Sequence, residues 1–209
     1  GPIGFDPVVS AISTCGSATQ PTGGTCTNAT ADAGTETLNL TGLTIGNTYY
    51  IQVHDNQGDA LSSSTFTICV SLPPSMTYTS SAITQQTGAA AAGSQYQKIL
   101  QLNIVTTNSY NPLSVSQLDF STSGTPGTTN VSDLTNARVY YTGSTSTWTD
   151  GSVSGTQFGS TLANPNGAMP FSGSQVLSAG SNYFWLVYDL TCGAVGTNID
   201  ASRPTNGIT

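Results

Sequence analysis

Few residues in this chain can carry out acid–base or nucleophilic chemistry. The sequence contains one histidine, His54, and one glutamate, Glu36. A Ser-His-Asp triad would have to combine His54 with Asp55 or Asp59, and no Gly-x-Ser-x-Gly turn precedes them. We therefore expect His54 to be an outward-facing strand residue, and we expect the chain not to be an enzyme.

Sialic acid chemistry is also a poor fit to the residue types. A sialidase holds the substrate carboxylate with a cluster of arginines, and this chain has only Arg138 and Arg203. Paired aspartates for glycoside hydrolysis stay open, because the acidic residues are spread along the sequence and their pairing cannot be read from it.

The balance of charge excludes two classes of partner. The formal net charge is −7, and 6% of the residues are charged. Binding of nucleic acid needs several phosphate contacts from Lys or Arg, and anionic membranes attract polybasic segments. Lys98 and the two arginines supply neither. No apolar run approaches the roughly 20 residues of a membrane-spanning helix, so we expect no nucleic acid partner and no membrane insertion.

One turn offers oxygen ligands for a cation. Asp55, Asn56 and Asp59 lie on a glycine-containing turn, and calcium prefers six to eight oxygen ligands. The turn lacks the spacing and the final glutamate of an EF-hand, which favours a solvated turn. Calcium is the one cofactor that the sequence leaves open.

Trp148 is the candidate for ligand binding, because it lies in the polar run Thr145-Ser-Thr-Trp-Thr-Asp-Gly151. If the indole is exposed, it can stack on a sugar ring and bind surface glycans. If it folds over the edge of a sheet, it is part of the protein core. The sequence favours the second arrangement.

The four cysteines are Cys15, Cys26, Cys69 and Cys192. There is no Cys-x-x-Cys motif, so a zinc site is not expected. Cys15 and Cys26 bracket a polar loop, and we predict a disulfide between them, with two free buried thiols as the alternative. The state of Cys69 and Cys192 stays open.

One sequence pattern occurs twice and predicts two central strands, the first of which carries His54 and Asp55. Residues 43–55 and 177–189 share Leu-[Ser/Thr]-x-Gly-x-x-Tyr-aromatic-x-x-Val-x-Asp. We interpret each copy as a glycine turn that leads into a central strand, with Tyr49 and Tyr183 as tyrosine corners whose hydroxyls bond to nearby backbone. Tyr183, Trp185 and Val187 are then predicted to point inward. A loop, a second layer or a partner must cover the opposite face, which carries Phe184, Leu186 and Tyr188.

Short alternating segments and frequent turns predict an all-β protein with two tandem immunoglobulin- or fibronectin-like β-sandwich domains. We place a small domain at residues 1–72, with its last strand at 64–71. A Pro-Pro linker at 73–75 and a second domain at 76–209 follow. The apolar positions change face between Val115 and Leu118, which predicts a β-bulge.

Residues 76–200 resemble the N-terminal accessory module of BNR-repeat neuraminidases and of large secreted bacterial surface proteins. The stretches that carry the resemblance are Asn111–Phe120, Asn136–Gly143, Gln157–Ser160 and Phe171–Leu177. Residues 35–74 resemble more weakly the end of a fibronectin-like or pre-peptidase C-terminal-type domain. Both resemblances imply a non-catalytic module.

These observations predict an extracellular structural or adhesive module on the bacterial cell surface, within a longer protein or fibre. Its partners would be other domains of that protein or identical subunits. One alternative is a carbohydrate-binding accessory domain of a secreted hydrolase. A second is a filament subunit that assembles by strand addition, for which the strand around residues 8–12 is the candidate.

Overall fold

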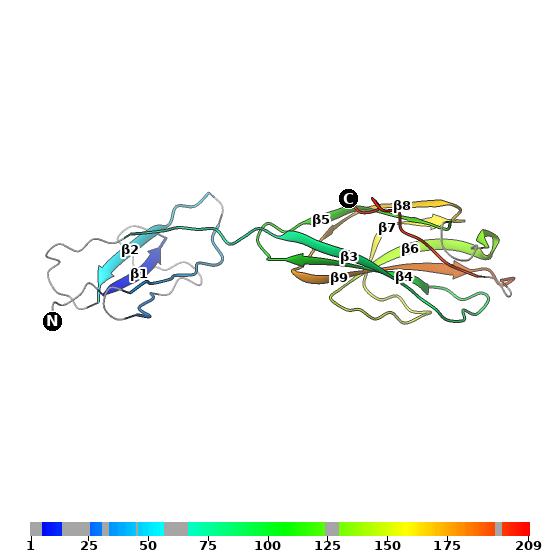
Figure 1. Ribbon diagram of the computed structural model, residues 1–209, viewed down its shortest axis with the longest axis horizontal. Helices are drawn as coiled ribbons and strands as arrows, with labels where there is room; N and C mark the ends of the chain where they lie inside the picture. Colours follow the sequence, from blue (N-terminus) through cyan, green and yellow to red (C-terminus); the bar gives the residue numbers. More distant parts are fainter. Residues whose placement is uncertain are drawn as a thin grey trace. The chain divides into compact units, whose positions relative to one another are not determined.

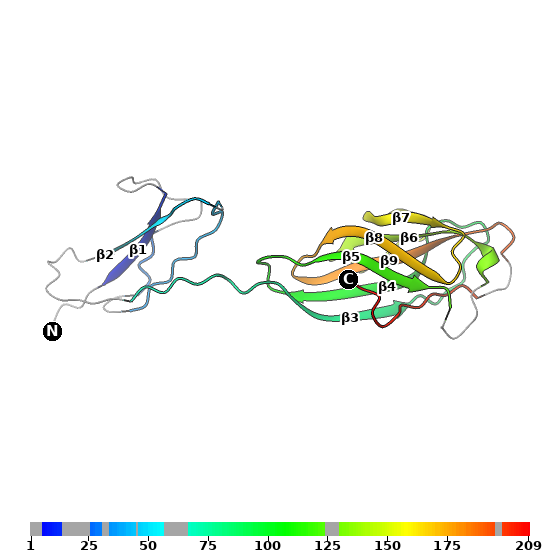
Figure 2. The same ribbon diagram turned by 90° about the horizontal axis from the view of Figure 1, so that it is seen from above.

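The computed structural model describes residues 6–13, 26–30, 34–44, 46–56, 67–123, 130–194 and 198–209 (Figures 1 and 2). The chain divides into two compact units, Gly1–Val70 (unit 1) and Ser71–Thr209 (unit 2). The predicted linker at 73–75 lies just after this division. The described residues form strands and one short 3-10 turn, without an α-helix, which confirms the all-β class. Among them, no helix is long and apolar enough to cross a membrane.

In its described part, unit 1 contains one antiparallel pair of strands, β1 (Pro7–Ile12) and β2 (Tyr50–Asp55). Within β1, the side chains of Val8 and Ala11 are buried. The last strand predicted for this unit, at 64–71, is wrong for residues 67–71, which lie outside any strand. Within the described part of the chain, the apolar side chains of Ile68 and Val70 are exposed, Val70 to 81%. Residues 64–66 lie outside the described part.

Unit 2 contains a five-stranded antiparallel sheet in the order β3-β4-β9-β6-β7 and a two-stranded sheet β5-β8 (Figure 2). The strands are β3 (Thr77–Gln85), β4 (Gln97–Thr107), β5 (Ser114–Ser121), β6 (Leu134–Gly143), β7 (Thr156–Ala163), β8 (Ala168–Val176) and β9 (Gly180–Leu190). A 3-10 turn, η1 (Val131–Asp133), leads into β6. The register of β5 shifts between Val115 and Gln117, which confirms the predicted bulge.

The core of unit 2 lies between these two sheets, because β5 and β8 cover one face of the larger sheet. The central strand β9 contributes Phe184, Leu186 and Tyr188, which are fully buried. Phe120 of β5 and Phe171 of β8 meet edge to face, with ring centroids 6.2 Å apart. Burial raises the pKa of the Tyr188 phenol well above its usual value, so this side chain is a neutral part of the core.

The predicted orientation of β9 is wrong. Phe184, Leu186 and Tyr188 face the core, whereas Trp185 and Val187 lie in a second cluster on the outer face. From Tyr183 to Tyr188 every residue of the strand is aromatic or aliphatic, so the period-2 alternation carries no polar face there that would fix the orientation. The expectation that a second layer covers the face of Phe184 is confirmed, since β5 and β8 form that layer.

The two copies of the repeated pattern share the glycine turn, because Gly46 and Gly180 have φ angles of 88° and 93°. They differ at the tyrosine. The Tyr49 hydroxyl accepts a hydrogen bond from the Thr44 amide at 2.9 Å, as expected of a corner tyrosine. Tyr183 is half-buried on the outer face, and Asn182 holds the turn instead.

Asn182 is fully buried and bonds to the turn in both directions. Its Oδ1 accepts from the Ser178 amide at 2.9 Å, and its Nδ2 donates to the Ser178 carbonyl at 2.8 Å. The Tyr141 hydroxyl donates to the same Oδ1 at 2.7 Å. The phenol that supports this turn therefore comes from β6 rather than from β9.

Tyr141→Phe is expected to lower the free energy of unfolding of unit 2 by about 1 kcal/mol, because it removes one donor to a buried amide. Tyr183→Phe serves as the matched control and should be close to neutral. Chemical denaturation of both variants measures the difference. A larger loss of stability for Tyr183→Phe than for Tyr141→Phe would indicate that Tyr183 is the tyrosine that supports this turn.

Candidate functional site

The outer face of the five-stranded sheet carries a cluster of aromatic side chains beside a buried ion pair. Trp185 and Val187 of β9 lie beside Tyr140 of the paired strand β6 and form one buried cluster with Trp148. Trp148 belongs to the connection of residues 144–155 between β6 and β7. We call this group, together with Tyr96, the outer cluster.

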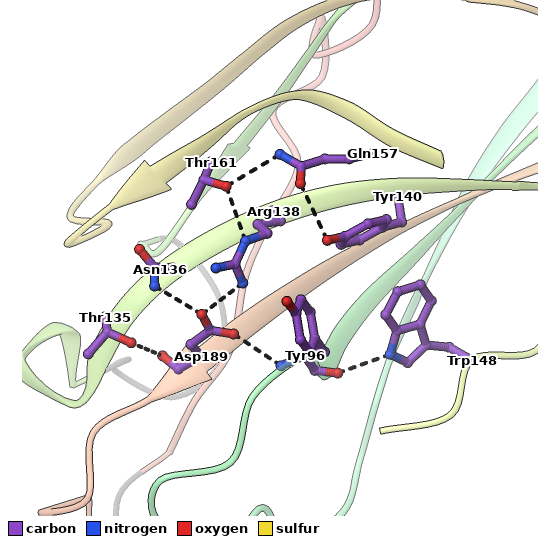
Figure 3. Close-up of polar contacts among 9 residues, drawn as sticks. All are labelled: Tyr96, Thr135, Asn136, Arg138, Tyr140, Trp148, Gln157, Thr161 and Asp189. Atoms are coloured by element: carbon purple, nitrogen blue, oxygen red, sulfur yellow. Dashed lines mark hydrogen bonds and ion pairs between the residues drawn. The ribbon is translucent and has the colours of Figure 1, made fainter. Parts of the chain in front are cut away.

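Trp148 is not an exposed platform for a sugar. Its side chain is 5% exposed, and its ring centroid lies 5.2 Å from that of Tyr140 and 6.4 Å from that of Trp185. Its Nε1 donates to the Tyr96 carbonyl at 3.0 Å (Figure 3). This burial agrees with the arrangement that the sequence favours, in which Trp148 is part of the protein core, and it gives no support to a ligand-binding role for Trp148.

Beside the aromatic rings lies the ion pair between Arg138 of β6 and Asp189 of β9. Arg138 Nη1 lies 2.7 Å from Asp189 Oδ2, and the two side chains are 15% and 6% exposed. The guanidinium carbon is 5.0 Å from the centre of the Tyr96 ring, a cation–π contact. Arg138 Nε donates to Thr161 Oγ1 at 3.1 Å (Figure 3).

The Asp189 carboxylate accepts hydrogen bonds from three donors. Besides Arg138, these are Asn136 Nδ2 at 2.9 Å and the Tyr96 amide at 3.1 Å. Tyr96 is thus bonded through its amide to Asp189 and through its carbonyl to Trp148. This double attachment holds the backbone of Tyr96 at a φ of 52°. Residues other than glycine rarely adopt this left-handed conformation.

The rim of the cluster is formed by β7. The Tyr140 hydroxyl donates to Gln157 Oε1 at 3.3 Å, and Gln157 Nε2 donates to Thr161 Oγ1 at 3.3 Å. Burial raises the pKa of the Tyr140 phenol, so it stays a neutral donor. Most polar groups of the cluster are bonded to one another, which fits a structural role, whereas the buried Nε1 of Trp185 has no hydrogen-bond partner in the structure.

The predicted calcium ligands have other partners. Asp55 Oδ1 accepts from the Asp6 amide at 3.1 Å, and Asn56 Nδ2 donates to Asp6 Oδ2 at 3.1 Å. Asp59 lies outside the described residues. Within the described ranges, no three His, Cys, Asp or Glu residues come together as a metal site. Calcium binding by Asp55, Asn56 and Asp59 stays a prediction.

The cysteines give no support to the predicted disulfide. Cys26, Cys69 and Cys192 are free and exposed, and Cys15 lies outside the part of the chain that the structure describes. His54 is exposed on β2, on the solvent side of the strand.

Sequence reasoning missed the Arg138–Asp189 pair, although the repeated pattern contained a signal for it. Each copy ends in an aspartate, and each aspartate accepts an amide hydrogen bond from a distant segment. Asp55 Oδ1 accepts from Asp6 at 3.1 Å, and Asp189 Oδ1 accepts from Tyr96 at 3.1 Å. The last residue of the pattern is thus the one that anchors another part of the unit to the strand.

One comparison with known proteins gives a match. A family model described as the N-terminal domain of BNR-repeat neuraminidase matches residues 79–201, which is more than half of the chain. The matched region begins within β3 and extends past the end of β9, so it contains the outer cluster. No curated protein matches the chain.

Proposed function

Since the chain belongs to the family of N-terminal domains of BNR-repeat neuraminidases, we propose that it is a non-catalytic accessory module that acts outside the cell. It serves as a structural or adhesive part of a larger bacterial surface protein. Its partners are the other domains of that protein or further copies of the same chain. In this proposal unit 2 is an immunoglobulin-like sandwich, with β5–β8 and the C-terminal residues as its second layer.

The observation that carries this proposal is that Arg138 and Arg203 each contact other residues of the chain, in separate places. Arg138 is neutralised by Asp189 within the sheet at 2.7 Å. Arg203 is half-buried, and its Nη2 lies 3.5 Å from Ser81 Oγ. A sialidase needs arginines that converge on a substrate carboxylate, whereas here they stabilise separate parts of the scaffold.

Low charge supports an extracellular structural role. Only 6% of the residues are charged, and serine, threonine, glycine and asparagine make up much of the rest. The carbohydrate-binding alternative loses its support, because the tryptophan on which it depended is buried.

The purified chain is expected to release no fluorophore from a fluorogenic sialic acid glycoside above the rate of a buffer blank. It should also show no reproducible signal on a glycan array. Turnover that disappears in Arg138→Met would contradict the non-catalytic assignment. Sugar binding that survives in the folded chain would instead favour the accessory domain of a hydrolase.

A further inference from the structure

One guanidinium of unit 2 has no counter-charge. Lys98 pairs with Asp150 and Arg138 pairs with Asp189, whereas Arg203 forms no ion pair with any residue that the structure describes. The Nε atom of Arg203 is buried and has no hydrogen-bond partner among the same residues. Buried polar groups are nearly always bonded, so Arg203 lacks the acceptor that such a donor normally has.

Arg203 lies in the C-terminal segment that follows β9 and reaches from β5 to β3. Its neighbour Ser202 pairs with Ser121 of β5 through two backbone hydrogen bonds of 2.8 Å. The guanidinium reaches Ser81 of β3, with Arg203 Nη2 3.5 Å from Ser81 Oγ. A Cβ at Gly207 would lie 3.1 Å from Arg203 Cγ. The aliphatic part of the side chain therefore packs on this glycine and holds the guanidinium beside β3.

The hydroxyl beside the guanidinium is a further hydrogen-bond donor. The Tyr78 hydroxyl donates to Ser81 Oγ at 3.0 Å, and the contact of Arg203 with the same oxygen is long for a hydrogen bond. Since Ser81 Oγ accepts in both contacts, its own proton remains available for another acceptor. Tyr78 is 55% exposed and Arg203 is only half-buried, so a ligand can reach these donors from solvent.

We propose that Arg203 and Ser81 bind a carboxylate. A guanidinium presents its N–H groups in a planar fork that matches the two oxygens of a carboxylate. The Ser81 hydroxyl adds a donor at the side of the fork, and the negative charge of the ligand neutralises the guanidinium. The contact of 3.5 Å between Arg203 and Ser81 is weak, so the side chain gains more from the ligand than it loses.

The acidic residues of the neighbouring segments have other partners. Asp200 Oδ1 accepts from the Ala201 amide at 2.7 Å. The carboxylate of Asp119 on β5 accepts from Gln117 Nε2 at 2.8 and 3.0 Å. Because neither carboxylate forms an ion pair with Arg203, the carboxylate that neutralises Arg203 has to come from a ligand.

An acidic sugar and an acidic side chain of a protein share this chemical group. The proposed function expects no signal on a glycan array, so we expect the second source, and this choice rests on the proposed function. A signal from acidic glycans that is lost in Arg203→Gln would identify the sugar as the source. It would contradict the proposed function and support the site.

Titration of the whole chain with sodium acetate at constant ionic strength tests the site, followed by the NMR signals of the arginine side chains. The sequence contains two arginines, so the spectrum contains two Nε–H signals. The Arg203 signal is expected to shift and to reach saturation. The Arg138 signal should stay in place, because Asp189 already neutralises that guanidinium. Acetamide, which has a similar shape without the charge, should shift neither signal. If acetate shifts neither signal, or shifts both alike, the proposal is overturned.

Variants assign the binding to these residues. Arg203→Gln is expected to raise the acetate dissociation constant at least about tenfold, measured at the backbone amide of Ser81. Ser81→Ala keeps the arginine and should raise the constant about threefold or more, measured at Arg203 Nε. Lys98→Gln is the matched control, since it removes the same charge elsewhere in unit 2 and should leave the constant unchanged. Equal effects of Arg203→Gln and Lys98→Gln would show a response to overall charge and would overturn the site.

Discussion

Replacing Trp148 with alanine is expected to lower the free energy of unfolding of unit 2 by about 3–5 kcal/mol. The indole is 5% exposed and contacts Tyr140 and Trp185. Its removal leaves a cavity on the outer face and takes away the donor to the Tyr96 carbonyl. Chemical denaturation followed by circular dichroism gives the size of the loss.

Val153→Ala is the matched control, since Val153 lies in the same connection between β6 and β7 but is 53% exposed. Its effect should stay within about 0.5 kcal/mol. Similar losses for the two variants would show that Trp148 does not anchor the connection. Trp148 lies in unit 2. If unit 1 unfolds in a separate transition, the midpoint of that transition should therefore be the same in the variant and the wild-type chain.

Asp189→Ala is expected to lower the free energy of unfolding of unit 2 by about 3–5 kcal/mol. The change leaves the Arg138 guanidinium, 15% exposed, without its counter-charge. It also removes the acceptor for Asn136 Nδ2 and for the Tyr96 amide. The loss should depend only weakly on salt, because a buried pair is poorly screened.

The control for this variant is the exposed ion pair of the same unit. Lys98 Nζ lies 3.5 Å from Asp150 Oδ2, and these side chains are 33% and 36% exposed. Asp150→Ala should cost no more than about 1 kcal/mol, since water screens such a pair. A loss at Asp150 as large as that at Asp189 would contradict the structural role assigned to the buried pair.

The sequence allowed the strands of unit 2 to be predicted more reliably than their faces. Glycine turns, the bulge after Val115 and the repeated pattern are local signals, and the structure contains each of them. The face of β9 depends on what packs on each side. Phe184 and Trp185 are both buried, one beneath β5–β8 and the other beneath the connection of residues 144–155. A strand buried on both faces carries no alternation that distinguishes them.

The outer cluster depends on contacts between residues far apart in the sequence. Arg138 and Asp189 are 51 residues apart, and they meet because β6 pairs with β9. Strand order is a property of the tertiary fold, so the repeated pattern marks Asp189 as an anchor, but composition and spacing do not identify Arg138 as its partner. For Trp148, the sequence favoured an indole folded over the edge of a sheet rather than an exposed one, and this agrees with its burial.

The attachment of Tyr96 has a consequence for the lifetime of the native state. Its two backbone bonds reach residues 52 and 93 positions away, so they cannot form before β9 and the connection of residues 144–155 have come together. Closing long loops precedes such contacts. Contacts absent from the transition state for folding slow unfolding and leave the folding rate almost unchanged. We therefore expect that disrupting the outer cluster speeds the unfolding of unit 2 more than it slows its folding.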